Sequence, residues 1–218
     1  MENASQYEKP ALHYAMGRAA NGSVAFYKRV FMGGVSAGSY PPQSFERAML
    51  FVDGTNLFHR LEAEKLKAIV PLSDHNWWNS ATRGRQLHRV YLYTSEPHLE
   101  KAKKVHGEKF LSGVRVVLGD AVQTSGGFKE KGVDALLVAD LIYHAAAKNF
   151  NYAVLVSVDT DFAYAIKRAE DFGCQTGVLG ICSSLPERLK VSADHSFEMV
   201  KLELINRKLV EVITKQVA

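Results

Sequence analysis

The chain has 218 residues, of which 47% are hydrophobic and 23% charged, so we expect one globular domain with a single core and at most a small extension. A formal net charge of +4 permits a polyanionic partner without identifying one, and two cysteines without metal-ligand spacing indicate reduced thiols rather than a disulfide framework. No apolar run reaches the roughly 18 to 20 residues of a membrane span, and no basic stretch followed by an apolar one opens the chain, so we expect a non-secreted, cytoplasmic protein with no membrane partner.

The first 46 residues differ in composition from the rest. They are rich in Gly and Ser, contain the pair Pro41-Pro42 and hold only short apolar pieces, which predicts an N-terminal extension of unknown role over residues 1–46. Within it, "FYKRVF" (26–31) mixes aromatic and basic residues and could contact nucleic acid, although an edge strand, a partner contact or disorder is together favoured. The organised domain is expected over residues 47–218.

From residue 47 onward, strand-length apolar runs alternate with longer segments of helical period, which is typical of β/α units. The runs are apolar without strict alternation, so we expect the strands to be covered on both faces. We therefore predict an α/β fold, a three-layer α/β/α sandwich around a central, mainly parallel sheet. The predicted strands cover 48–52, 89–93, 114–118, 153–158 and 176–180, and the predicted helices cover 56–69, 98–111, 132–148, 161–172 and 203–215.

Acidic residues follow two of these strands directly. Asp53 comes after the first strand, and Asp159 and Asp161 come after the fourth. In open α/β sheets, ligand sites gather beyond the carboxyl ends of the strands, where the strand order reverses. If the first and fourth strands are neighbours, three carboxylates converge within a few ångströms, which like-charge repulsion penalises unless a cation neutralises them. The pattern therefore indicates a metal site.

The stretch "KEKGVDALLVADL" (129–141) supplies a further acid, Asp134, in the first turn of a predicted helix. The helix dipole favours an acid there, so a first-turn or capping role is an alternative to a role in the site. Asp140 lies six residues further, roughly a third of a turn off the Asp134 face at about 100° per residue, and is at best a supporting residue.

Three blocks of the chain carry a family resemblance. "FVDGTNL" (51–57), "KEKGVDALLVADL" and "VLVSVDTDFAYAIKRAEDFGCQTGVLG" (154–180) resemble, in order, the signature blocks of the NYN domains, the PIN-like ribonuclease superfamily that includes LabA-like bacterial proteins. The similarity covers residues 47–200. The chain departs at Val158, where family members often have Gly, and nothing before Arg47 matches.

The resemblance implies a PIN-like (Rossmann-like) fold and a carboxylate cluster that binds Mg²⁺ or Mn²⁺ for RNA cleavage. Block matching carries the family's functional positions onto Asp53, Asn56, Asp134, Asp159 and Asp161.

The chemistry supports these ions independently. Phosphodiester hydrolysis needs a water made nucleophilic near neutral pH and neutralisation of the charge that grows on the phosphoryl oxygens. A group of Asp residues without His or Cys fits Mg²⁺ or Mn²⁺ rather than Zn²⁺. We expect the main cation to be held, directly or through water, by Asp53, Asp134 and Asp159. Asp161 would complete its shell or help recruit a second ion. Asn56 would orient a water or a substrate oxygen, or cap a helix.

Substrate binding requires positive charge near the acids. Lys129 and Lys131, just ahead of Asp134, are expected to meet a phosphate, with a solvated loop as the alternative. Arg85 belongs to the basic stretch "TRGRQLHR" (82–89), which follows Trp77 and Trp78; an exposed tryptophan pair there would suit single-stranded RNA, although tryptophans are more often core residues.

Two classes of function therefore remain. The favoured one is a Mg²⁺- or Mn²⁺-dependent ribonuclease whose partner is RNA, expected to be single-stranded. The alternative is an RNA-binding or regulatory NYN module with little or no catalysis. The apolar segment "LELINRKLVEVI" (202–213) could pack on its own sheet or on a partner, which leaves a homo-oligomer open.

Overall fold

The computed structural model describes residues 12–18, 24–30, 44–124 and 127–213, and the chain divides into two units, 1–40 and 41–218. In the first unit, β1 (Leu12–Arg18) pairs antiparallel with β2 (Val24–Val30), so most of "FYKRVF" forms a strand. The rest of the predicted extension up to residue 43 lies outside the described residues. The second unit opens with β3, which begins at Ser44, slightly ahead of Arg47.

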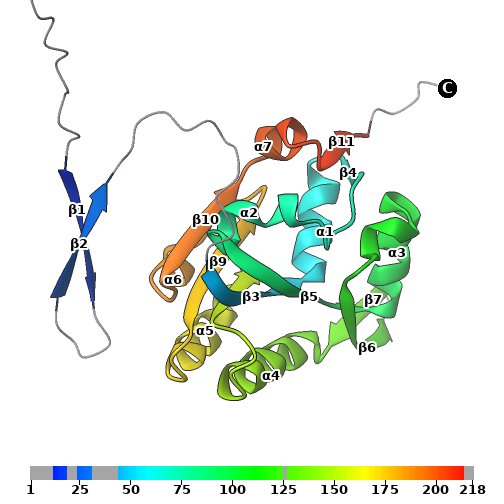
Figure 1. Ribbon diagram of the computed structural model, residues 1–218. Coiled ribbons are helices and arrows are strands. Elements are labelled where there is room, and N and C mark those ends of the chain that lie inside the picture. Colours follow the sequence, from blue (N-terminus) through cyan, green and yellow to red (C-terminus); the bar gives the residue numbers. More distant parts are fainter. Residues whose placement is uncertain (1–11, 19–23, 31–43, 125–126, 214–218) are drawn as a thin grey trace, which may run out of the picture. The chain divides into compact units, whose positions relative to one another are not determined.

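A seven-stranded sheet forms the centre of the second unit (Figure 1), with the order β10-β9-β8-β3-β5-β6-β7. All neighbours are parallel except β6 and β7, which are antiparallel. The predicted sheet is therefore confirmed, and β7 and β10 are additional strands. The strands are β3 (Ser44–Asp53), β5 (Arg85–Ser95), β6 (Arg115–Thr124), β7 (Gly127–Lys131), β8 (Tyr152–Val156), β9 (Gln175–Ile181) and β10 (His195–Met199).

Helices cover both faces of this sheet, which confirms the three-layer sandwich. One core cluster joins β3 side chains such as Leu50 to α1, α3 and α7, and the other joins Phe51 to α4 and α5. The helices are α1 (Gly54–Ala63), α2 (Asn79–Thr82), α3 (Glu96–His106), α4 (Val133–Ala146), α5 (Ala163–Glu170), α6 (Glu187–Lys190) and α7 (Lys201–Asn206), with 3-10 turns η1 (His75–Trp77), η2 (Glu108–Leu111) and η3 (Thr160–Phe162).

Two predicted helices are wrong in their second halves, and the cause is shared. The helix predicted over 56–69 ends at Ala63, and β4 (Leu66–Ala68) follows; the one predicted over 203–215 ends at Asn206, and β11 (Val210–Val212) follows. These two short strands pair antiparallel with each other. Their pairing decides the structure here, and it overrides the helical period of the apolar residues on which the two helices were predicted. The C-terminal segment therefore packs on its own domain through Leu204, Leu209 and Val210.

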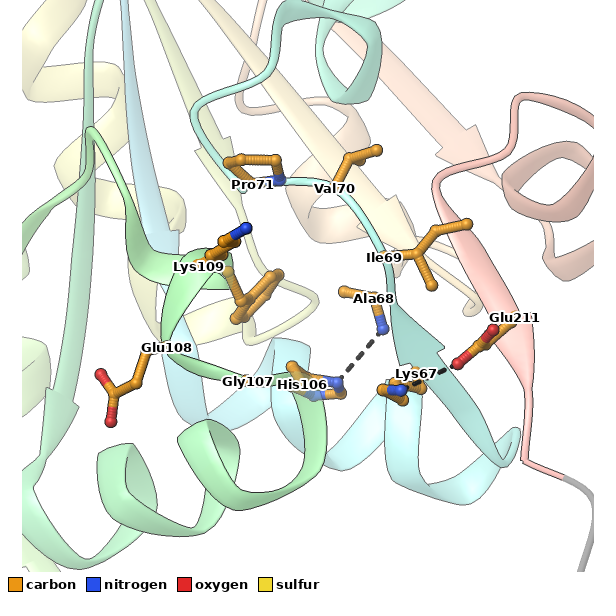
Figure 2. Close-up of a pocket in the computed structure, with 11 residues that line it drawn as sticks. Lys67, Ala68, Ile69, Val70, Pro71, His106, Gly107, Glu108, Lys109 and Glu211 are labelled. Atoms are coloured by element: carbon orange, nitrogen blue, oxygen red, sulfur yellow. Dashed lines mark hydrogen bonds and ion pairs between the residues drawn. The ribbon is translucent and has the colours of Figure 1, made fainter.

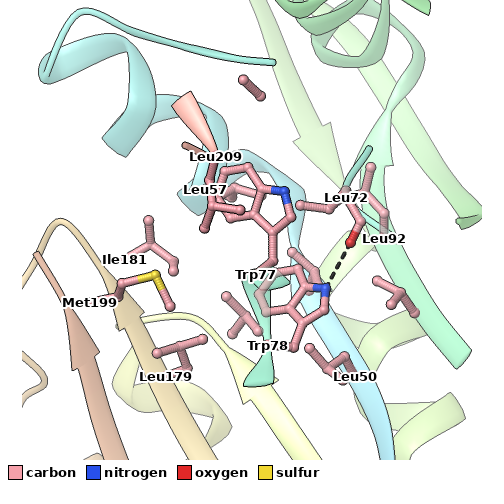
Figure 3. Packing of buried hydrophobic residues seen from close by; sticks show 14 of the residues in the cluster. Leu50, Leu57, Leu72, Trp77, Trp78, Leu92, Leu179, Ile181, Met199 and Leu209 are labelled. Atoms are coloured by element: carbon pink, nitrogen blue, oxygen red, sulfur yellow. Dashed lines mark hydrogen bonds between the residues drawn. The ribbon is translucent and has the colours of Figure 1, made fainter. Parts of the chain in front are cut away.

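Trp77 and Trp78 belong to the core, where both are 0% exposed (Figure 3). The Trp78 indole donates to the Leu72 carbonyl at 2.7 Å, and the two indoles pack with Leu57, Ile181 and other apolar side chains. The pair therefore offers no surface on which a base could stack, and the more usual core role is the one that the structure has. Among the helices of the described residues, none has the length and apolar character needed to cross a membrane.

Candidate active site at the carboxyl edge of the sheet

The two strands that carry the predicted acids are neighbours. β3 pairs in parallel with β8 on one side and with β5 on the other, so the chain moves outward from β3 in opposite directions. This is the strand-order reversal at which α/β sheets place ligand sites. The condition for bringing Asp53 and Asp159 to one edge is therefore met.

Asp53 is the buried member of the group, with 8% of its surface exposed. It ends β3 and caps α1, because Oδ1 accepts a hydrogen bond from the backbone nitrogen of Asn56 at 3.0 Å. Oδ2 accepts a second bond from the Ser157 hydroxyl at 2.8 Å. Burial raises the pKa of the Asp53 carboxyl; these two hydrogen bonds act against that rise, and the nearby charges of Asp134 and Asp159 add to it.

Asp159 is tied to Asp53 through one oxygen atom. The Ser157 hydroxyl donates to Asp53 and accepts from the backbone nitrogen of Asp159 at 3.1 Å. The Asp159 carboxylate then caps η3 by accepting from the Asp161 backbone nitrogen at 2.9 Å. Ser157, directly after β8, is 1% exposed, so the hydroxyl that makes both hydrogen bonds is buried. Ser157 was not predicted as a site residue, although its place directly after a buried strand is the signal that could have identified it.

Asp134 stands in the first turn of α4, after Gly132, which adopts a positive φ of 79°. The pKa of its carboxyl is raised, first because surrounding atoms displace part of its water and then because Asp159, Glu130 and Asp161 carry like charge nearby. Asp134 therefore faces the same edge as Asp53 and Asp159. Asp140 instead accepts a hydrogen bond from the Tyr93 hydroxyl at 3.0 Å.

The acids share the edge without closing around one point. Among the described residues, no three His, Cys, Asp or Glu side chains are grouped so that they could hold a metal ion as they stand. The expectation that three carboxylates converge within a few ångströms is corrected to this extent. Its physical reason is exposure: Asp134, Asp159 and Asp161 are at the surface, where water solvates each one separately, and only Asp53 is buried.

The donor set nevertheless suits a hard divalent cation. Each oxygen of Asp53 accepts one hydrogen bond within the described part of the chain, and a carboxylate oxygen has two lone pairs, so a further acceptor site remains on each. Mg²⁺ keeps several waters and needs only one or two direct carboxylates, so acids spaced around an edge can bind it through water. The chemistry of the set therefore fits, although the side chains must move to bind it directly.

Asn56 does not cap α1, since Asp53 does, and only the backbone of Asn56 takes part. Its amide side chain is half-buried at the start of α1, one turn from Asp53. The capping alternative is thus replaced by the other expectation, a polar side chain available to a water or substrate oxygen, which stays a prediction.

Glu130 is a second residue at this edge, after Ser157, that was not predicted from the sequence. Its Oε1 accepts from the Ser95 backbone nitrogen and contacts His98 Nδ1, both at 2.8 Å, and its Oε2 accepts from the Thr55 hydroxyl. Burial acts to raise the pKa of the Glu130 carboxyl, but the hydrogen bonds from Thr55, His98 and Ser95 outweigh it and the pKa is lowered. Glu130 thus ties β7 to the starts of α1 and α3. The signal was present in two polar residues, Ser95 at the end of β5 and His98 in the first turn of α3.

Lys129 and Lys131 flank Glu130 on β7 and are exposed. Successive side chains of a strand point to opposite faces, so both lysines point away from the face that Glu130 uses. The backbone of both lysines lies near the acidic edge. Whether their ammonium groups reach a phosphate there depends on the conformation of their long side chains. Their role stays a prediction.

Arg85 is not brought to this edge. It begins β5 and lies opposite Ser44 in the sheet, whereas Asp53, at the other end of β3, lies opposite Tyr93. Its guanidinium pairs with Glu46 at 2.7 Å, donates to Gln175 and lies 4.3 Å from the ring centroid of Tyr152. The expectation that it binds substrate beside the acids is therefore corrected: a strand of this length separates them, and Arg85 ties the amino ends of the strands together.

A pocket of about 480 Å³ lies elsewhere, between β4 and the end of α3 (Figure 2). It is lined by Lys67–Pro71, His106–Phe110 and Glu211 and includes none of the acids. The His106 Nδ1 accepts from the Ala68 nitrogen at 3.2 Å, and burial, then the charge of Lys67, lowers its pKa to about 4. A neutral, hydrogen-bonded His106 is part of the packing, so we place the candidate site at the acidic edge.

Gly54 allows α1 to start close to β5, and a substitution there tests this local geometry. A Cβ at Gly54 would lie 2.7 Å from the Tyr93 carbonyl oxygen. We expect Gly54→Ala to lower the free energy of unfolding by about 1–3 kcal/mol, the usual cost of overpacking, and to displace Asp53. Denaturant unfolding measures the loss; Gly107→Ala, which has open space around its Cβ but a φ of 84°, separates steric cost from backbone cost. Equal stability of Gly54→Ala and wild type would contradict the close approach.

A family model for the NYN domain matches residues 47–202, which is most of the chain and includes Asp53, Glu130, Asp134, Asp159 and Asp161. The chain belongs to the NYN domain family. This membership implies a PIN-like domain of the nuclease type, with RNA as the family's substrate and divalent metals as its typical cofactors. The match therefore covers nearly all of the central sheet; β3 begins three residues before it, and Leu204, Leu209 and Val210 of one core cluster lie beyond it.

Two individual proteins are similar to this chain. The chain is 35% identical over 81 residues to the uncharacterized protein y4oD of Sinorhizobium fredii, a match that spans 36% of this chain and only 38% of that protein. A crystal structure of a Vibrio parahaemolyticus protein of unknown function superimposes with a TM-score of 0.54 at 19% identity, over 78% of this chain and 98% of that one. The second likeness shows that the α/β fold is shared.

Proposed function

We propose that this NYN domain is a metal-dependent ribonuclease that hydrolyses RNA phosphodiester bonds at the carboxyl edge of β3 and β8, and we assign the activity to residues 47–218. The observation that carries the proposal is Asp53, a carboxylate with 8% exposure beside two other acids. Burying an acid near like charges costs stability and is common at functional sites. Asp53 has no basic partner among its described contacts.

Mg²⁺ or Mn²⁺ is the ion that this donor set would take, because all the candidate ligands are oxygen atoms. Asp53, Asp134 and Asp159 would hold it directly or through water, with Asp161 completing the shell or helping to hold a second ion. Such an ion supplies an ionised water near neutral pH and neutralises charge on the phosphoryl oxygens.

The chain's own residues prepare the site. The Ser157 hydroxyl and the Asn56 nitrogen fix the orientation of the Asp53 carboxylate, which lowers the ordering cost of ligation. The Asn56 side chain would orient a water or substrate oxygen. Lys129 and Lys131 would offset the repulsion between the acids and the RNA phosphates.

A chelation experiment tests this proposal. We expect the purified chain to cleave end-labelled RNA in Mg²⁺ or Mn²⁺, to lose the activity in EDTA, and to regain it when either ion, but not Zn²⁺, is restored. Product sizes on a denaturing gel report cleavage. Undiminished cleavage in EDTA would contradict a metal-dependent site.

A second function is favoured by one observation. Since no three acids among the described residues stand ready to hold an ion, the domain could bind RNA without cutting it. Under that alternative, RNA binding survives in EDTA and no product forms with any of the ions.

A further inference from the structure

One exposed face of η3 and α5 carries an ordered set of side chains beside the acids. Asp161, Tyr164 and Arg168 are spaced at i, i+3 and i+7, so they lie along one side of the helical segment. Tyr164 is 63% exposed, and it stands three residues, about 4.5 Å of α-helical rise, from Asp161. An aromatic ring is therefore presented to solvent next to the candidate active site.

Arg168 holds this ring in place. Its Nε donates to the Tyr164 hydroxyl at 2.7 Å, and its guanidinium carbon lies 5.0 Å from the ring centroid. The guanidinium is held in turn by Asp171, because Arg168 Nη1 donates to Asp171 Oδ2 at 2.7 Å. Because both ends of the arrangement are tied, the ring loses little conformational freedom when something packs on it.

Such a surface recognises a particular kind of ligand. Single exposed aromatic residues are ordinary, but this one is braced by an arginine and adjoins a group of acids. Unpaired nucleobases stack on aromatic rings and guanidinium planes, and arginine also meets backbone phosphate. A base inside a duplex is already stacked on both sides and cannot use the ring without being extruded.

We propose that Tyr164 and Arg168 form a stacking platform for an unpaired nucleobase adjacent to the phosphodiester that is cut, which makes single-stranded RNA the substrate. The proposal rests on the proposed function for the position of the cut, and it replaces Trp77 and Trp78, which are buried, as the aromatic contact to RNA.

The chain offers a matched control. Tyr143 on α4 is also 63% exposed, and it stands nine residues along its helix from Asp134, about 13 Å of rise away from the acidic edge. Removing its ring takes away the same exposed aromatic surface from a different place. Tyr164→Phe is a second control, since it keeps the ring and removes only the hydroxyl to which Arg168 donates.

The experiment measures RNA affinity in the Asp53→Asn background, which prevents cleavage during the measurement. Fluorescence anisotropy gives Kd for a labelled single-stranded oligoribonucleotide and for a duplex of the same sequence. We expect Tyr164→Ala to weaken single-strand binding about tenfold, within the range of one base stacked on one ring. Tyr164→Phe should change it by less than about threefold, Tyr143→Ala should leave it unchanged, and the duplex should bind equally to all variants.

Other outcomes overturn the platform. These are a loss in Tyr164→Ala no greater than in Tyr143→Ala, equal losses for single strand and duplex, or no measurable single-strand binding by the Asp53→Asn parent. Failure of the proposed function looks different: wild type with Mg²⁺ or Mn²⁺ then cuts no RNA, while the selective loss in Tyr164→Ala persists. Conversely, if wild type cleaves RNA but Tyr164→Ala leaves the Kd unchanged, only the proposed stacking platform is contradicted.

Discussion

Replacing Asp53 by Asn is expected to reduce RNA cleavage on the order of 10³-fold, because it removes the one buried carboxylate from the proposed ligand set. The fold should remain. The Asn oxygen can still accept from the Asn56 nitrogen, and its amide can donate to Ser157 once that hydroxyl reorients. Since the change also removes a charge that Asp134 and Asp159 repel, the metal-free variant should melt at the same temperature as wild type or higher.

The measurement combines rate and melting temperature. Cleavage of labelled RNA in Mn²⁺ gives the rate, and thermal unfolding with and without Mn²⁺ gives the stabilisation by the ion, which wild type should show and Asp53→Asn should lack. Asp159→Asn should behave alike. Glu211→Gln is the control, because it makes the same carboxylate-to-amide change at an exposed ion pair with Lys67, away from the acids. If wild type and all three variants cleave RNA at equal rates, Asp53 and Asp159 have no part in the reaction.

The placement of Asp53 and Asp159 at one edge of the sheet could be predicted from sequence, and the reason is physical. Buried parallel strands need long apolar runs, so β3 and β8 are visible as such, and an acid directly after each run must lie at the carboxyl edge. What the runs alone leave open is which strands are neighbours. The pairing of β3 with β8 answers that.

Residues that act through partners distant in sequence could not be found in the same way. β4 and β11 form because they meet each other, whereas the apolar residues around both segments recur with a helical period. Arg85 lies in a basic stretch that straddles the start of β5, so its distance from the acids depends on where that strand begins. In the sequence, Glu130 is a single acid between two lysines, which indicates only a solvated charge. Its contacts with Thr55, Ser95 and His98 are visible only in the structure.

Glu130 leads to the second large expected effect. Replacing it by Ala should lower the free energy of unfolding by about 2–3 kcal/mol, because it leaves the Ser95 nitrogen and the Thr55 hydroxyl without their acceptor at a site where the glutamate side chain is only 16% exposed. Cleavage should fall about 10- to 100-fold, the usual effect of losing a residue that orients an active site without touching the substrate. Denaturant unfolding and the RNA assay measure the two losses.

The pH dependence and a control distinguish this role from simple loss of charge. The folded-state pKa of Glu130 lies below its ordinary value of 4.5, so its contribution is present above pH 4.5 and is lost as the pH falls through the folded-state pKa. The stability gap between wild type and Glu130→Ala should therefore narrow in acid. Glu100→Ala, which removes an exposed acid of α3 paired with Lys103, should change stability by less than about 1 kcal/mol. If Glu130→Ala were as stable and as active as Glu100→Ala, β7 would be held at the acidic edge by its pairing with β6 alone, and Glu130 would have no part in tying β7 to α1 and α3.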